Sequence, residues 1–238
     1  MSSLYLIRHG QAGTRWNYDA LSDLGHQQAY LLGQYLAAQK IPFKALIAGC
    51  LNRQQQTAAE VRRAYGEAGL AVPEIVSDAG WNEFDMTAVF SEFAPLLSEA
   101  DPRFKQEHQE LLRILENADS PVHRAWTECD TQAMRAWMEG RFPSRIESWA
   151  DFRRRVLDRR ASLEAYQPGD AVAVFTSATP IAIWMASALS LSDVLFMRLA
   201  GVLYNSAVTT MRLRDDELML FTFNGVPHLH EPHLRTFL

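Results

Sequence analysis

The sequence has few cysteines: Cys50 and Cys129 are the two among its 238 residues, and they lack CxxC spacing. Two such thiols make neither a disulfide framework nor a zinc site, so we expect both to be reduced. No window approaches the roughly 18 uninterrupted apolar residues of a membrane span. The opening residues, MSSLYLIRHG, lack the basic region and long apolar stretch of a signal peptide. These absences predict a cytoplasmic protein with no membrane partner.

Strong charge of one sign is also missing. The net charge is −5, and the densest basic stretches are Arg153–Arg155 and Arg159–Arg160, within one expected helix. Arginines so placed are typical of a solvated helix face, so we expect no nucleic-acid partner. The apolar fraction of 48% suits a globular core. The length favours a single α/β domain over residues 1–238, with room for an insertion.

Apolar runs and helical spacing alternate through the first third of the chain. This order predicts a three-layer α/β sandwich, with a mostly parallel central sheet and helices on both faces. The expected elements are a strand at Leu4–Ile7, a helix at Leu24–Gln39, a strand at Ala45–Ala48, a helix at Gln54–Ala64 and a strand at Val72–Val76.

The strand signal disappears from Thr87 to about Tyr166, where prolines punctuate several helical segments. We interpret residues 86–149 as a helical insertion that runs into a long return helix. Sheet character resumes beyond it, and a short polar link near the end suits an antiparallel hairpin. The expected later elements are a strand at 171–175, a helix at 181–189 and strands at 207–213 and 218–223.

Arg8 and His9 directly follow the first strand, where open α/β sheets place their ligands. An imidazole beside a guanidinium suits an anion site. A histidine after a strand more often marks an ordinary polar turn, so this short motif leaves both interpretations open.

Six ordered segments of the chain, spread over most of its length, resemble the histidine phosphatase superfamily, which includes the cofactor-dependent phosphoglycerate mutases. We recognise no such segment in the insertion, between Asp85 and about Trp149. The matching segments are LIRHGQA, YDALSDLGHQQAYLLGQYL, ALIAGCLNRQQQTAAEV, GWNEFD, AVAVFTSATPIA, and the pair LYNSAV and FNGVPHL near the end.

The resemblance implies that neutral His9 is the nucleophile that accepts the phosphoryl group. It implies that Arg8 and Arg53 hold the nonbridging oxygens and that Gln11 lines the pocket. The alternative for Arg53 is an exposed cation in the first turn of a helix. The helix dipole disfavours a cation there, which favours an anionic partner.

The family's acidic residue aligns with Glu83, which would protonate the leaving oxygen and then activate water. Asp85, two residues later, is the rival for this role, and both could instead be plain loop carboxylates. Asn17 or Tyr18 could reach the pocket, although the loop that carries them is longer than in the mutases.

The chain departs from the family after Phe175, where the family's second catalytic histidine is replaced by Ser177. We expect Ser177 and Ala178 to help bind the substrate, because the helix that starts near Pro180 aims backbone N–H groups at an anion. Removing a preorganised donor typically slows turnover about a hundredfold, so the enzyme is expected to be slow.

A histidine-rich stretch, His228, His230 and His233, invites a metal interpretation. Val-Pro-His-Leu belongs to the family's pattern and no acidic cluster accompanies it, so we expect neither a metal nor a cofactor.

The sequence therefore predicts a metal-independent phosphatase acting on a small phosphorylated molecule. A weakly active or inactive phosphate-binding scaffold and a mutase remain the alternatives. Neither the substrate nor the oligomeric state follows from these residues.

Overall fold

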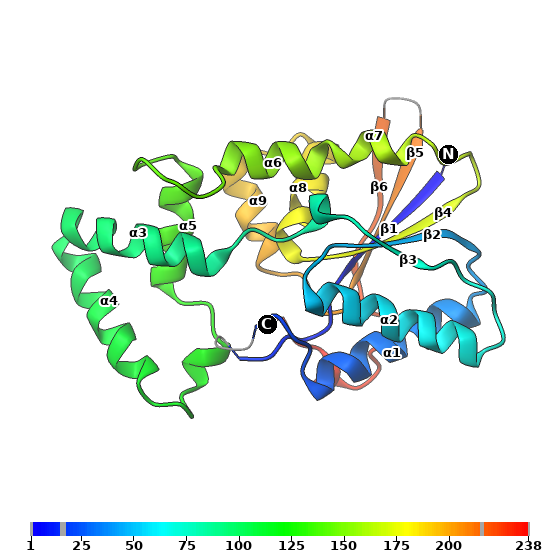
Figure 1. Cartoon of the computed structure of the whole chain (residues 1–238), viewed down its shortest axis with the longest axis horizontal. Coiled ribbons are helices and arrows are strands. Elements are labelled where there is room, and N and C mark those ends of the chain that lie inside the picture. Colours follow the sequence, from blue (N-terminus) through cyan, green and yellow to red (C-terminus); the bar gives the residue numbers. More distant parts are fainter. Residues whose placement is uncertain (1, 15–17, 215–216, 238) are drawn as a thin grey trace. The chain divides into compact units, whose positions relative to one another are not determined.

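The computed structural model describes residues 2–14, 18–214 and 217–237 (Figure 1). The chain folds into two compact units. The first comprises the described residues of Met1–Gly13, Asn17–Glu83 and Val156–Leu238, and the second those of Thr14–Trp16 and Phe84–Arg155. No helix in the described ranges is long and apolar enough to cross a membrane.

A six-stranded sheet with the order β3-β2-β4-β1-β5-β6 forms the centre of the first unit (Figure 1). Strands β1, β2, β3 and β4 run parallel, and β5 pairs antiparallel with β1 and β6. The expected mostly parallel sheet and terminal hairpin are thus confirmed, although Asp215 and Asp216 of the hairpin link lie outside the described residues. The strands are β1 (Ser2–Arg8), β2 (Phe43–Ala48), β3 (Ile75–Ser77), β4 (Ala171–Thr176), β5 (Val208–Arg214) and β6 (Glu217–Gly225).

Helices flank this sheet, as the order of elements predicts. Helix α2 contacts β2, β3 and β4 and packs along α1, whereas α8 contacts β1, β6 and α9. The helices and short 3-10 turns of the first unit are α1 (Asp23–Ala38), α2 (Asn52–Glu67), η2 (Ala79–Trp81), α7 (Arg159–Leu163), α8 (Ala178–Leu189), α9 (Asp193–Ala200) and η4 (Pro232–Leu234).

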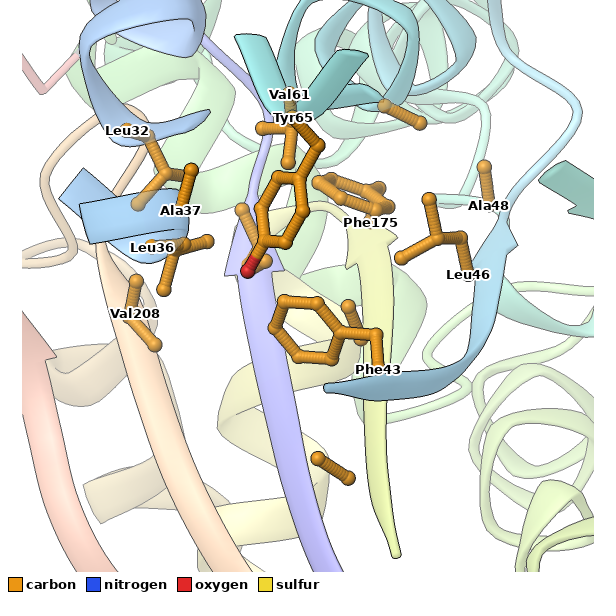
Figure 2. Packing of buried hydrophobic residues seen from close by; sticks show 14 residues of the cluster. Leu32, Leu36, Ala37, Phe43, Leu46, Ala48, Val61, Tyr65, Phe175 and Val208 are labelled. Carbon is orange, nitrogen blue, oxygen red and sulfur yellow. The ribbon is translucent and has the colours of Figure 1, made fainter. Parts of the chain in front are cut away.

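The core between the sheet and the α1–α2 pair is built from alternate residues of the strands. Ile7 and Phe175, from neighbouring strands, belong to one cluster with Leu32 of α1 and Tyr65 of α2, and all four are at most 1% exposed. Figure 2 shows Phe175, Leu32 and Tyr65 within this cluster. Burial of side chains this large stabilises the fold by about 1.5–3 kcal/mol each. Because the core fixes α2 over the sheet, it also fixes where the first turn of α2 meets the strand ends.

The second unit is helical and has its own aromatic cluster. Phe84 stacks on Trp137 with ring centroids 4.8 Å apart, and Trp149 and Phe152 pack against the same indole. Pro95 lies inside α3 and does not end it. The elements of this unit are α3 (Met86–Ala100), α4 (Pro102–Leu115), η3 (Pro121–Arg124) and α5 (Glu128–Met138), with most of α6 (Trp149–Leu157).

Three expected elements differ from the structure. Val72–Glu74 are not in a strand, because Pro73 has no N–H to pair, and β3 begins at Ile75. The return helix is interrupted at Asp158, which separates α6 from α7. Helix α8 begins at Ala178, with Pro180 in its first turn, where a missing N–H breaks no intrahelical bond.

Candidate active site

His9 directly follows β1, at the edge of the sheet where the four parallel strands end. Its backbone N–H donates to the Thr176 carbonyl at 2.9 Å, and its own carbonyl accepts from Ser206 N at 3.1 Å and Asn205 Nδ2 at 3.5 Å. The residue is 1% exposed. Contacts from both neighbouring strand regions therefore hold its backbone.

The imidazole of His9 is fixed in one tautomer by its neighbours. Nδ1 lies 2.7 Å from the Gly10 carbonyl, which can only accept, so Nδ1 carries the proton. Nε2 therefore carries no proton, and its lone pair accepts a hydrogen bond from Arg53 Nε at 3.3 Å. Burial, together with the charges of Arg53 and Arg8, lowers the pKa of His9 well below its ordinary value of 6.5. The ring is neutral at neutral pH and has a nucleophilic nitrogen.

Arg53 is the second residue of α2, where the helix dipole disfavours a cation. Its Nη1 donates to Asp19 Oδ1 at 3.0 Å, and its guanidinium lies 4.8 Å from the Tyr18 ring centroid. Thr57, one turn later, accepts from Gly10 N and donates to the Arg53 carbonyl. This threonine joins the helix to the loop that carries His9. In this structure the anionic partner of Arg53 is thus the carboxylate of Asp19.

Arg8, at the end of β1, is buried with part of its hydrogen-bonding capacity unused. Nη1 donates to the Leu203 carbonyl, and Nε has no hydrogen-bond partner among the described residues. Burial lowers the pKa of Arg8, while Tyr18 and Glu83 oppose that shift. A buried guanidinium with a spare N–H is well suited to receive an anion.

Glu83 and Ser177 meet at the N-terminus of α8. Glu83 Oε2 accepts from Thr179 N at 3.0 Å, so a carboxylate occupies one of the N–H groups that we expected to face an anion. Ser177 is the N-cap residue of α8, with Ala178 as the first helical residue, and its side chain makes no cap hydrogen bond. Its Oγ instead accepts from Gln54 Nε2 at 2.9 Å.

The remaining expected site residues have other local partners. Gln11 Oε1 accepts from Ser22 Oγ at 2.8 Å. Asp85 is the N-cap of α3 and accepts from Ala88 N, whereas the charge of Glu83 acts on the buried Arg8. Asn17 lies outside the described residues, whereas the Tyr18 ring centroid lies 6.3 Å from that of His9.

His228, in the histidine-rich stretch, supports the backbone of the site. His228 is 3% exposed, and its Nε2 lies 2.7 Å from Oγ of Ser206, whose backbone N–H holds the His9 carbonyl. Burial lowers the pKa of His228 to about 3. Among the residues that the structure describes, no group of three or more His, Cys, Asp or Glu side chains could hold a metal ion.

Sequence reasoning missed four residues of this site. Asp19 pairs with Arg53, Gln54 bonds Ser177, and Asn205 and Ser206 hold His9. The LYNSAV segment could have indicated the last two, since it lies within the family resemblance. Gln54 lies in a run of three glutamines, which predicts only a helix. The direction in which its side chain points depends on tertiary packing.

Comparison with known proteins gives a family match over almost the whole chain. The model of the histidine phosphatase superfamily (branch 1) matches residues 4–114 and 115–225. Two 2,3-bisphosphoglycerate-dependent phosphoglycerate mutases, from Brucella ovis and Brucella abortus, are each 32% identical over 90 residues. That match covers 35% of this chain and 42% of each relative, so it spans less than half of their length.

Solved structures with the same fold include two phosphatases. Phosphoserine phosphatase from Entamoeba histolytica is 20% identical, with a TM-score of 0.61, over 96% of this chain and 100% of its own. A mycobacterial glucosyl-3-phosphoglycerate phosphatase is 21% identical, with a TM-score of 0.60, over 94% and 97% of the two chains. Identities this low indicate a shared fold.

Proposed function

Since the chain belongs to the histidine phosphatase superfamily, we propose that it is a metal-independent phosphatase acting through a phosphohistidine on His9. This proposal rests on the neutral His9 ring, whose Nε2 lone pair lies beside the guanidinium of Arg53. A protonated imidazole could not attack phosphorus. A neutral one flanked by fixed positive charge is suited to approach a phosphate dianion.

In the first half-reaction, Nε2 of His9 attacks the phosphorus of a monoester, and the bond to the leaving oxygen breaks. Glu83 gives its proton to that oxygen, so the alcohol departs neutral. Arg53 turns from Nε2 and Asp19 to the nonbridging oxygens, and Arg8 offers its spare N–H. Positioning and fixed charge supply most of what phosphoryl transfer needs.

In the second half-reaction, ionised Glu83 removes a proton from water as the water oxygen attacks phosphorus. The P–N bond breaks, its electron pair returns to His9 Nε2, and inorganic phosphate leaves. One carboxyl serves both steps because the first leaves it ionised.

The substrate class that we propose is a small phosphomonoester. The relatives named above act on phosphoserine, glucosyl-3-phosphoglycerate and phosphoglycerates, all of them small phosphorylated molecules. No contact among the described residues favours one of these molecules, so the substrate that we propose is the class as a whole. Phosphoserine and 3-phosphoglycerate are the first compounds to assay.

Steady-state release of inorganic phosphate separates this proposal from its alternatives. The parent protein should release phosphate from at least one small monoester, and His9→Ala should abolish that release. Transfer of the phosphoryl group between positions of phosphoglycerate without net release would indicate a mutase. Binding of vanadate with no turnover of any monoester would indicate a scaffold.

Metal independence has a separate test. Arginines meet the phosphoryl charge in the proposed mechanism, so EDTA should leave the rate unchanged. A large loss with EDTA that one divalent ion restores would contradict this part of the proposal and direct attention to His228, His230 and His233.

A further inference from the structure

The first turn of α2 presents two consecutive polar side chains to two neighbouring strand ends. Arg53 Nε donates to His9 Nε2 at 3.3 Å, and Gln54 Nε2 donates to Ser177 Oγ at 2.9 Å. His9 follows β1 and Ser177 follows β4. These strands are parallel neighbours whose last paired residues lie opposite each other. The first turn of α2 therefore holds His9 and Ser177, which follow the two neighbouring strands.

The orientation of the Gln54 amide is set by its surroundings. Its nitrogen lies 3.3 Å from the Trp81 carbonyl, which can only accept, so that atom must be the donor. Its oxygen accepts from Leu51 N at 3.4 Å. That oxygen also lies where a Cβ on Gly49 would be, at 2.0 Å, so only glycine leaves room there. Gln54 is completely buried and is held at both ends of its amide.

This orientation decides what the Ser177 hydroxyl does. Because Gln54 is the donor, Ser177 Oγ is the acceptor, and its own proton must point elsewhere. The helix does not use this hydroxyl, since Glu83 accepts from Thr179 N in the first turn of α8. Among the described residues, Gln54 is the one hydrogen-bond partner of Ser177 Oγ. The hydroxyl proton is thus available to a bound ligand beside His9.

We propose that Gln54 is a positioning residue of the phosphatase reaction, and this rests on the function proposed above. By donating to Ser177, Gln54 directs the serine hydroxyl proton to a nonbridging oxygen of the phosphoryl group on His9. Burial of an amide is costly unless it is hydrogen-bonded, and this amide uses its bonds on the residue that flanks the nucleophile. Gln54 itself does not touch the phosphoryl group.

Two substitutions of Gln54 test its role. Gln54→Met keeps the length of the side chain and removes the donor, so kcat should fall about 3- to 10-fold, the value of one neutral hydrogen bond. Gln54→Glu keeps the shape but introduces a carboxylate that takes the Ser177 proton for itself, so kcat should fall about tenfold or more. KM should stay within about twofold in both, because the arginines bind the ground state.

The matched control is Gln55→Met, one residue further along α2. Gln55 is also hydrogen-bonded, to the Gly49 carbonyl and Ser77 Oγ, but has no contact with Ser177. Its kcat should equal that of the parent. Circular dichroism identifies any variant that fails to fold. If Gln54→Met does not fold, the kcat of the isosteric Gln54→Glu tests the proposal.

A double-mutant cycle with Ser177→Ala distinguishes positioning from a structural role. Without the serine hydroxyl there is nothing for Gln54 to orient, so Gln54→Met should have no further effect on kcat in that background. Equal losses in both backgrounds would overturn the proposal while leaving the phosphatase function intact. If the parent and His9→Ala release phosphate equally, the proposed function itself fails and this proposal fails with it.

Discussion

The carboxylate of Glu83 accepts a hydrogen bond from the backbone N–H of Thr179 at 3.0 Å, in the first turn of α8. This contact places the proposed acid and base beside Ser177, the N-cap of the same helix. It also gives Glu83 a contact that an amide can reproduce, because a glutamine side-chain oxygen accepts the same N–H.

Glu83→Gln should therefore fold and lose proton transfer alone. With alkyl phosphates, kcat should fall about 100-fold or more, because a poor leaving group needs its proton. With p-nitrophenyl phosphate the leaving group needs no acid, while water still needs the base. A burst of nitrophenol equal to the enzyme concentration, followed by slow turnover, is expected in rapid mixing.

The control for this variant is Asp85→Asn. Asp85 caps α3, and asparagine caps helices about as well, so neither activity nor stability should change appreciably. A loss of phosphate release in Asp85→Asn with normal turnover in Glu83→Gln would reverse the assignment of the two carboxyls.

If Arg53 binds the phosphoryl group as proposed, Asp19 competes with the substrate for its guanidinium. The two side chains pair at 3.0 Å, and the carboxylate is 48% exposed. An exposed ion pair is worth up to about 1 kcal/mol, so Asp19→Asn should lower KM by about two- to fivefold. The turnover number should not change. Steady-state kinetics and the vanadate inhibition constant measure the effect.

Asp23→Asn is the matched control, because it removes the same charge four residues away. Asp23 is an exposed residue in the first turn of α1. The KM of Asp23→Asn should therefore equal that of the parent. A higher KM in Asp19→Asn would mean that the aspartate orients Arg53 for binding and does not oppose the substrate.

Ser177 is expected to limit turnover, and its surroundings decide how a histidine there would behave. Gln54 lies 2.9 Å from the serine oxygen in a fully buried site, so the ring in Ser177→His has no free space. The single variant should gain little. Combined with Gln54→Ala, which makes room, the protonated ring should raise kcat about tenfold over the parent, because charge-assisted donors are roughly twice as strong. If the combined variant gains nothing with a correctly placed ring in its crystal structure, position 177 does not limit the rate.

Burial of His228 should make the protein less stable in acid. The folded pKa is about 3 and the ordinary value is 6.5, so between these values the unfolded chain binds the extra proton. Stability is therefore fully present above 6.5 and falls as the pH drops toward 3. At pH 5 the loss is about 2 kcal/mol relative to pH 7.

Urea unfolding at the two pH values measures this loss. His228→Gln has no titrating group there, so its stability should fall about 2 kcal/mol less than that of the parent between pH 7 and pH 5. His233→Gln, at an exposed position, is the control and should behave as the parent does. Equal acid losses in the parent and His228→Gln would show that His228 does not carry the effect.

The sequence predicted most of the fold because the elements around the sheet have strong local signals. Leu24–Gln39 and α1 differ by one residue at each end, and the apolar run at 171–175 is nearly all of β4. The return helix was predicted as one element because Arg and Leu around Asp158 all favour helix. Its interruption there has no strong signal in the local sequence.

The candidate site was predicted only in part. Arg8 and His9 stand at a strand end, where the local sequence suggests an anion site, whereas Glu83 was predicted from the family resemblance alone. Gln54 and Asp19 become relevant through contacts with residues 123 and 34 positions away in the chain. Contacts at such separations depend on packing, which composition and periodicity do not encode locally.

The covalent intermediate is the most direct test of the central claim. The parent protein should be mixed with a small monoester that it hydrolyses, quenched within milliseconds in alkali and digested for mass spectrometry. A phosphoryl group is predicted on the peptide that contains His9, lost on brief acid treatment and absent from His9→Ala. A phosphoryl group on another residue, or undiminished hydrolysis by His9→Ala, would contradict the account.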